Sequence, residues 1–428
     1  MVSHCRGAGC FQTAKPALLM PLLTRNEAVL KPLRALHLGM SVLDSGSSYS
    51  SEDAGGEEHE VAPLEFFFDL VFVFGFVQIT TFLADNLTWT GLLRGIALLA
   101  ALWWAWICYS WLTNTVPADD ELRERVGLLC ATAGMFVVAL AVPNAFGETG
   151  VLFGVAYFVV RVLHIGLYTL TTEPETRQAI LRLGPGFLGA PALLVAAGFL
   201  DGPFQAGLWI IALAVDYGTP AVRDVTGFSV YAAHFVERYR EIVIIALGES
   251  ILAIGLEIGA DSPSVSLLVV TVALLGVSFA ATLAWLYFDY VTFAMEDNLA
   301  RADGPEQARM ARDTYSYLHL PIIMGIILVA LGLKKTVAGP GAPLDVIPAV
   351  ALCGGGALYL LGDAACRLRD TGTVSVPRLA VVALACAFVP VAIQIPAFLT
   401  LLAVVIPFIA LAVFETMGFG FQRRIIHT

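Results

Sequence analysis

The chain has 428 residues, of which 58% are hydrophobic and 14% are charged, and its mean hydropathy is +0.80. A soluble domain carries about 25% charged residues, so this composition excludes an ordinary soluble enzyme. It predicts an all-α, polytopic integral membrane protein in contact with a lipid bilayer. The net charge is −11 without a basic patch, so we expect no nucleic-acid partner. The seven cysteines lack metal-ligand spacing and no phosphate-binding glycine loop is present, so we predict no metal and no cofactor.

Residues 1–60 differ from the rest of the chain. They contain glycine, serine and an acidic cluster between residues 52 and 60. No apolar run before Met40 is long enough for a signal peptide with a cleavage site. We therefore predict a disordered cytoplasmic leader over residues 1–60, and translation starting at Met40 would also fit the sequence.

Apolar windows predict a transmembrane domain over residues 61–417 and a cytoplasmic tail over residues 418–428. Twelve spans are expected, at residues 64–85, 91–112, 123–143, 150–171, 184–200, 204–217, 233–258, 265–290, 313–333, 345–363, 379–396 and 398–416. The fifth span is the weakest, because glycine and proline gather at its start.

The charges in the loops predict the orientation of these spans. If the N-terminus is cytoplasmic, almost all loop arginines fall on the inside, as the positive-inside rule requires. The inside loops then hold Arg123, Arg125, Arg177, Arg182, Arg223, Arg301, Arg309, Arg312, Arg367, Arg369 and Arg378. The outside loops hold only Arg94, Lys334 and Lys335. We predict that both termini lie inside.

The two parts of the domain resemble each other in order, with half one at about 61–222 and half two at about 228–417. Span one has Glu65 and Asp69, and span seven has Glu237 and Glu241 at the same spacing. Tryptophan-containing runs at 103–106 and 284–287 occupy spans two and eight. Tyr157 with Arg161 in span four corresponds to Tyr359 with Asp363 in span ten.

These matches predict a six-plus-six parallel repeat of the kind that is familiar in transporters. They also predict that Arg161 and Asp363 meet near the axis that relates the halves.

The seventh span, from His234 to Ile258, carries more charge than a membrane helix normally does. At about 100° per residue, five of its ionisable groups fall within one third of the circumference. They are His234, Glu237, Arg238, Glu241 and Glu249. Charges at membrane depth cost several kcal/mol unless they are paired or wetted, so they usually mark a pathway, a relay or a site. The structural alternative is an ion network that neutralises itself between packed helices.

With this orientation, the ionisable groups gather in the cytoplasmic half of the domain, which suggests a polar cavity that opens to the cytoplasm. The candidate pathway residues are Glu65, Asp69, Arg161, His164, Asp216, His234, Glu237, Arg238, Glu241, Glu249, Asp289, His319 and Asp363. Burial favours the neutral form of a carboxylate such as Glu249, and histidines also titrate near neutral pH, so proton coupling would fit. Each histidine can instead be a hydrogen-bonded packing residue.

Several motifs in order resemble the bacterial low temperature requirement protein A family. They include Leu64–Phe74, Pro143–Gly147, Ala214–Pro220, His234–Gly255 and Asp313–Pro321. The resemblance covers about residues 60–416. It implies a multi-helix protein of the bacterial cytoplasmic membrane, from a family named after a growth defect in the cold. It implies no defined molecular activity.

Three functions remain open on the sequence. The first is a secondary transporter or permease for an unknown small solute, with Glu249 as the gating or coupling carboxylate. The second is a membrane-embedded enzyme that uses acid–base chemistry on a lipid or isoprenoid-like substrate. The third is a structural or regulatory membrane protein in cold tolerance. The sequence does not define the substrate, the coupling ion, the direction of movement or the oligomeric state.

Overall fold

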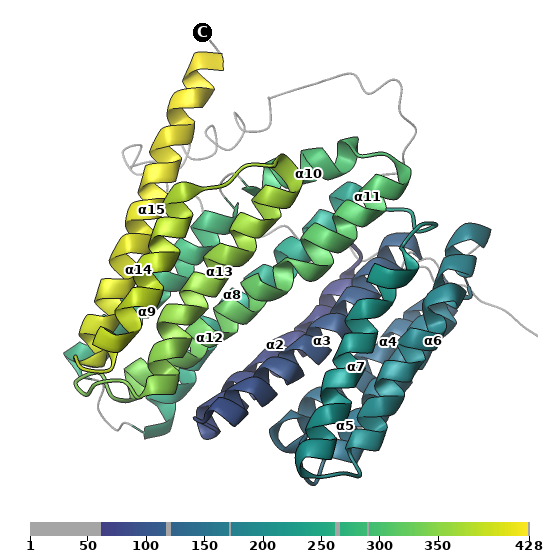
Figure 1. Cartoon of the computed structure of the whole chain (residues 1–428), viewed down its shortest axis with the longest axis horizontal. Coiled ribbons are helices and arrows are strands. Elements are labelled where there is room, and N and C mark those ends of the chain that lie inside the picture. The colour runs from purple at the N-terminus through teal and green to yellow at the C-terminus, as the bar shows by residue number, and fades with distance from the viewer. Residues whose placement is uncertain (1–60, 117–120, 171–172, 262–265, 289–290, 427–428) are drawn as a thin grey trace, which may run out of the picture. The chain divides into compact units, whose positions relative to one another are not determined.

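The computed structural model describes residues 61–116, 121–170, 173–261, 266–288 and 291–426 (Figure 1). Their regular structure is helical, apart from an isolated antiparallel bridge between Pro343 and Pro396. The segment for which we predicted a leader, and the candidate residue Asp289, lie outside the described residues.

Each predicted span coincides with a helix. Half one contains α2 (Pro63–Asp85), α3 (Trp89–Thr115), α4 (Leu122–Ala141), the short 3-10 turn η1 (Val142–Asn144), α5 (Gly150–Tyr168), α6 (Pro174–Ala197) and α7 (Gly202–Arg223). Half two contains α8 (Ala232–Asp261), α9 (Leu267–Phe288), α10 (Val291–Arg301), α11 (Gly304–Met310), the π-helical segment η2 (Ala311–Tyr317), α12 (His319–Ala338), α13 (Val346–Thr371), α14 (Val376–Ala392) and α15 (Ala397–Ile426).

In the described part of the chain, ten helical segments are long and apolar enough to cross a membrane. Helix α14 is apolar but only 17 residues long, and α7 is not among the ten. A helix satisfies all of its backbone hydrogen bonds internally, which the hydrocarbon core requires. The prediction of an all-α, polytopic membrane protein is therefore confirmed, while the count of twelve spans stays a prediction.

Helix α6 starts ten residues earlier than the fifth span was predicted to start. It begins at Pro174 and continues through Pro185 and Pro191. The predicted start at residue 184 was wrong because prolines interrupt a soluble helix more severely than a packed membrane helix, where neighbouring groups can satisfy the freed carbonyls. Proline at the first helical position also suits a helix start, because its missing N–H has no intrahelical partner there.

Helices α12 and α13 pack closely through glycines. A Cβ atom on Gly325 would lie 2.6 Å from the carbonyl oxygen of Gly355, and one on Gly332 would lie 2.6 Å from the Leu352 Cβ. Small residues at such positions let the backbones of membrane helices approach each other. Helices α12 and α13 are thus closely packed within half two, and α12 also packs against α8.

The two halves meet along α2 and α8. Helix α2 packs against α3 and α4 of its own half and also against α8 and α12 of the other half (Figure 1). Helix α3 is among the most buried of the spans, and its side chains Trp103, Trp104 and Trp106 are almost completely enclosed. Polar groups on α2, α3 and α8 are thereby brought into a shared interior.

Candidate functional site

A buried ion network joins the first helix of each half. Arg238 on α8 forms two hydrogen bonds with the Asp69 carboxylate on α2, from Nη1 at 2.8 Å and from Nη2 at 2.9 Å. Its Nε lies 3.2 Å from Oε2 of Glu65. His234 Nε2 lies 3.1 Å from Oε1 of Glu65. All four side chains are at least 97% buried. Because the carboxylates and their partners are both spaced by four residues, each pair occupies one helix face.

Side chains of α3 and the start of α2 complete this network. Trp106 Nε1 donates to Oδ1 of Asp69 at 2.9 Å, and the Asn114 amide lies 3.1 Å from His234 Nδ1. The backbone N–H of Ala62 donates to Glu65 at 3.2 Å. The additional donors offset the loss of hydration that two buried carboxylates suffer. Buried ion pairs and hydrogen bonds therefore join the two halves here, while Arg238 Nε and Glu65 Oε2 face each other without a hydrogen bond of normal geometry.

Two other predicted residues of α8 take different places. Glu241 lies at the edge of the network, with Oε2 3.5 Å from Arg238 Nη1. Glu237 is half exposed and pairs with Arg240 at 3.2 Å. Arg240 also reaches Glu296 on α10 at 2.7 Å. The predicted common face thus holds His234, Arg238 and Glu241, but the structure separates Glu237 from them.

A second buried pair lies inside half one. Arg161 on α5 donates from Nη2 to Oδ1 of Asp216 on α7 at 2.8 Å, and the Tyr157 hydroxyl donates to Oδ2 of Asp216 at 3.2 Å. Arg161 also contacts Cys108 Sγ on α3, and its guanidinium lies 4.6 Å from the centre of the Phe187 ring. Asp216 is therefore a helix-interior partner of Arg161 rather than a charge at a helix end.

The third cluster lies inside half two. Arg378 on α14 pairs with Asp363 on α13 and makes two hydrogen bonds to Glu415 on α15, at 2.9 Å and 2.8 Å. Arg367 also lies 3.4 Å from Asp363. Asp363 and Arg161 thus have separate partners, so the prediction that they meet near an axis was wrong. A charged residue in a span revealed Asp363, but Arg378 was misassigned to a loop because the eleventh span was predicted to begin one residue later, at 379, whereas α14 begins at Val376.

His319 lies at the start of α12, directly after the π-helical segment η2. Its Nδ1 is 2.9 Å from the Thr314 carbonyl oxygen, and its Nε2 is 2.9 Å from the Tyr287 hydroxyl. The carbonyl can only accept, so Nδ1 carries the proton and Nε2 accepts from Tyr287. His319 is a fully bonded packing residue, which is the alternative that the sequence had left open.

Glu249 lies deeper along α8, away from the ion network. Its side chain is 1% exposed, and Oε2 has no hydrogen-bond partner. Thr80 on α2 is a polar neighbour of Glu249, and Lys334 on α12 contributes a positive charge. Lys334 itself lies 3.9 Å from Glu257, two turns further along α8. A buried carboxylate with an open oxygen is unusual and marks a candidate functional group.

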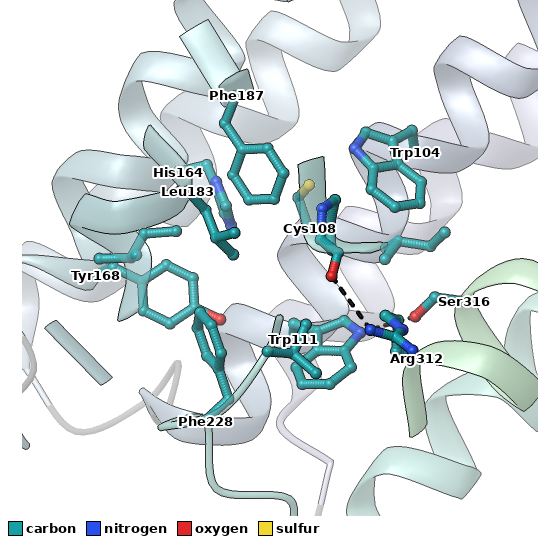
Figure 2. A pocket seen from close by; sticks show the side chains of 14 residues that line it. Trp104, Cys108, Trp111, His164, Tyr168, Leu183, Phe187, Phe228, Arg312 and Ser316 are labelled. Carbon is teal, nitrogen blue, oxygen red and sulfur yellow. Dashed lines mark hydrogen bonds between the residues drawn. The ribbon is translucent and has the colours of Figure 1, made fainter. Parts of the chain in front are cut away.

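A cavity opens between α3, α5 and α6, with the loop after α7 and η2 at its edge. Figure 2 shows Trp104, Trp111, Tyr168, Phe187 and Phe228 around it. The space open to the centre of a water-sized sphere is about 40 Å³. The edge also carries Arg312, which donates to the Pro220 carbonyl oxygen at 3.2 Å and contacts Asp313 at 2.7 Å.

Of the predicted pathway residues, only His164 lines this cavity. The predicted polar cavity, lined by the carboxylates of α2 and α8, therefore differs from this cavity, which is largely aromatic. Tyr168 and Arg312 were not among the predicted residues, because an aromatic residue in an apolar run and an arginine that the sequence places in a loop carry no local signal of a cavity. Within the described residues, no group of three His, Cys, Asp or Glu side chains could hold a metal ion.

The loop after α7 positions one wall of the cavity. Asp224 has a positive φ of 59°, which is rare for a residue other than glycine. Its carboxylate accepts from the Val225 N–H at 2.8 Å and from the Thr226 hydroxyl at 2.8 Å. These hydrogen bonds lower the pKa of Asp224 and hold the turn that carries Val225 and Phe228 to the cavity.

These features define the class of the molecule: a multi-pass α-helical membrane protein with buried ion pairs inside and between its halves. The model of the bacterial low temperature requirement A (LtrA) family matches residues 60–413. The chain is also 32% identical over 314 residues to an uncharacterised protein of Rhizobium meliloti (strain 1021), covering 70% of this chain and 75% of that protein. The chain belongs to the LtrA family.

Proposed function

We propose that the protein is a secondary transporter of a small solute, in which two six-helix halves move about the α2–α8 contact. The matching helix neighbours of the halves support this proposal. The contacts of α2 with α4, of α3 with α7 and of α5 with α6 have counterparts in α8 with α12, α9 with α15 and α13 with α14. Parallel repeats of this kind underlie alternating access in known transporter folds.

Individual side chains support the same correspondence. The Tyr157 hydroxyl oxygen on α5 lies 3.1 Å from the Ala101 carbonyl oxygen on α3. The Tyr359 hydroxyl on α13 donates to the Leu283 carbonyl oxygen on α9 at 2.7 Å. In both halves, an acidic residue of the last helix also binds a buried arginine: Asp216 in half one and Glu415 in half two.

Two contacts outside the spans fit a topology of twelve spans, whereas the placement of both termini in the cytoplasm rests on the positions of the loop arginines. In that topology, the loops after α12 and α14 are both outside, and the Ala397 N–H donates to the Ala342 carbonyl oxygen across them at 2.8 Å. The loop after α7 and helix α11 are both inside in that topology, and Arg309 on α11 lies 3.5 Å from Asp224 in the loop. Each contact joins segments that this topology places on the same side of the bacterial cytoplasmic membrane.

The proposal rests mainly on the contact between α2 and α8, which are the first helices of the two halves. Residues 65 and 69 of α2 contact residues 234 and 238 of α8, so the same four-residue step recurs on both sides. Opposite charges hold the halves together at one end of this contact. Glu249, on the same helix α8, has an unbonded carboxylate oxygen, so it can exchange a proton when the halves separate.

The test is a metabolite and lipid profile of cells and medium for a null strain that carries wild type, Glu249→Gln or Glu257→Gln. Glu257→Gln is the matched control, because Glu257 lies on the same helix but is partly exposed. We expect one compound to change compartment without chemical change in Glu249→Gln alone. A compound that is chemically converted would identify an enzyme instead. Identical profiles at normal and low temperature would favour a structural role.

A further inference from the structure

Arg238 is surrounded by three carboxylates, although it supplies a single positive charge. Its Nη1 lies 2.8 Å from Oδ2 of Asp69 on α2 and 3.5 Å from Oε2 of Glu241 on its own helix α8. Its Nε lies 3.2 Å from Oε2 of Glu65 on α2. The Arg238 side chain is fully buried, and the Glu241 side chain is 11% exposed. If all three carboxylates were ionised, these four side chains would carry two net negative charges.

The neighbouring histidine does not supply the missing charge. The backbone N–H of Tyr231 donates to Oδ1 of Asn114 at 2.9 Å, which fixes the orientation of the Asn114 amide. Asn114 Nδ2 therefore lies 3.1 Å from His234 Nδ1, and an amide nitrogen can only donate. His234 Nδ1 is thus unprotonated, and the proton on Nε2 faces Glu65 at 3.1 Å. The imidazole is neutral in this arrangement.

The other charged groups around Glu241 do not balance the network either. Glu237, one turn earlier on α8, is half exposed and negatively charged. Arg240 is paired with Glu237 and with Glu296 of α10. Helix α9 contains no charged residue between its printed bounds. His319 at the start of α12 is a neutral imidazole, because its Nδ1 donates and its Nε2 accepts.

A proton is the cation that fits this excess of negative charge. Buried like charges are costly, and a carboxyl group in such a cluster takes up a proton instead of staying ionised. Water can hydrogen-bond to a buried carboxylate, but it does not remove the charge. Within the described part of the chain, no group of three His, Cys, Asp or Glu side chains could hold a metal ion.

The hydrogen bonds indicate which carboxyl group holds the proton. Both oxygens of Asp69 accept from Arg238, at 2.8 Å and 2.9 Å. Glu65 Oε1 accepts from His234 at 3.1 Å, and its Oε2 faces the guanidinium. Glu241 has one long contact with Arg238, at 3.5 Å, and its Oε1 is buried without a hydrogen-bond partner. Donors stabilise the ionised form, so Glu241, which has the weakest donors, takes the proton.

We propose that Glu241 is a proton-controlled switch, which determines whether Arg238 binds across the two halves or within its own helix. With the proton in place, Glu241 is neutral and Arg238 stays with Asp69 and Glu65 on α2. When the proton leaves to water, ionised Glu241 attracts the guanidinium three residues away and repels both carboxylates of α2. The contact between α2 and α8 then weakens, and the halves separate more easily.

The switch would connect protons with the movement of the halves. As a statement about coupling to solute movement, this inference rests on the proposed function. As a property of the contact between α2 and α8, it stands separately. It concerns Glu241 at the ion network, and not Glu249 deeper along the same helix.

Infrared spectroscopy of the purified full-length protein detects the proton directly, because a protonated carboxyl group has a C=O stretching band that a carboxylate lacks. A titration from about pH 5 to about pH 9 should remove such a band from wild type. Glu241→Gln should lack this titrating band. Glu237→Gln, the same change one turn away at a half-exposed position, should keep it. Identical titrating bands in wild type and Glu241→Gln would overturn the inference.

The separation of the halves is measured by double electron–electron resonance. Spin labels are placed through unnatural amino acids at Leu122 and Val376, which are exposed residues of different halves. Raising the pH should favour separated halves in wild type and in Glu237→Gln. A tenfold difference in proton affinity between the joined and separated states changes their ratio about tenfold. Glu241→Gln imitates the neutral acid, so its halves should stay joined at every pH.

Two results of the distance measurement would contradict the switch: distances in wild type that do not change with pH, and the same change in wild type and Glu241→Gln. The wild-type titrations decide the matter even if a variant fails to fold, which circular dichroism detects. Flux from proteoliposomes loaded with a bacterial metabolite extract is measured in parallel. A pH-dependent separation without flux would contradict the transporter and leave the switch standing. Flux without a pH-dependent separation would do the reverse.

Discussion

Asp69 and Arg238 form a two-pronged ion pair across the contact between the halves, although 169 residues separate them in the chain. Both Asp69 oxygens are engaged, at 2.8 Å and 2.9 Å, and neither side chain is more than 1% exposed. A planar guanidinium matches a carboxylate in this geometry, which lysine cannot reproduce. The pair fixes the register between α2 and α8.

Arg238→Gln should destabilise the protein by about 3 kcal/mol, because it leaves Asp69 and Glu65 buried without their cation. Unfolding in mixed micelles, followed by circular dichroism, measures the effect. Arg240→Gln is the matched control two residues away. Arg240 is partly exposed, so this change should cost less than about 1 kcal/mol. Equal losses in the two variants would show that burial of the network does not govern its strength.

The Arg161–Asp216 pair allows a test of whether the two buried charges matter to stability because they pair with each other. Arg161→Met and Asp216→Leu should each destabilise by about 3 kcal/mol, since each leaves one buried charge unpaired. The double variant should recover most of that loss, because buried pairs can often be replaced by apolar side chains. The free energies of unfolding of wild type, the two single variants and the double variant make up a double-mutant cycle, which measures the interaction between the two residues. A double variant as unstable as the sum of the single variants would contradict simple pairing.

Close packing of α12 and α13 predicts different outcomes for two neighbouring glycines. A Cβ atom on Gly355 would lie 2.8 Å from the Gly325 carbonyl oxygen and 2.9 Å from the Val329 nitrogen. Gly355→Ala should therefore destabilise by about 1–3 kcal/mol, as overpacking does. Gly354→Ala should be tolerated, because its Cβ would only reach a Val350 methyl at 3.8 Å. Thermal unfolding of both variants tests this, and equal behaviour would refute the close contact.

The lowered pKa of Asp224 gives a pH-dependent prediction. A carboxylate whose pKa is lower in the folded protein stabilises the fold above its unfolded pKa, and this stabilisation is lost as the pH falls through the folded value. Asp224→Ala should thus lower the thermal midpoint at pH 7 and have a smaller effect at pH 3. A difference between wild type and variant that does not shrink in acid would exclude the charged form as its source.

Much of the fold follows from composition and apolar periodicity, because a lipid environment leaves the helix as the main way to satisfy the backbone. The helix positions were therefore predictable even where bounds shifted, as at Pro174. The importance of Glu65, Asp69 and Arg238 was also predictable, because charge inside an apolar run is costly.

Pairing was less predictable, because partners depend on tertiary packing. Arg161 was expected to meet Asp363, but its partner is Asp216 in the same half. Arg378 follows a loop in the sequence, yet it is fully buried between α13 and α15. The aromatic cavity had no sequence signal either, since Tyr168 and Trp111 read as ordinary apolar residues until α3, α5 and η2 are placed together.

Flux in proteoliposomes distinguishes a transporter from an enzyme or a structural protein. The purified protein is reconstituted with a bacterial metabolite extract inside, a pH gradient is imposed in each direction, and mass spectrometry identifies what leaves. We expect at least one small solute to leave with wild type and with Glu257→Gln, and to leave at least tenfold more slowly with Glu249→Gln. Flux that is equal in wild type and Glu249→Gln, or no solute crossing under either gradient, would contradict it.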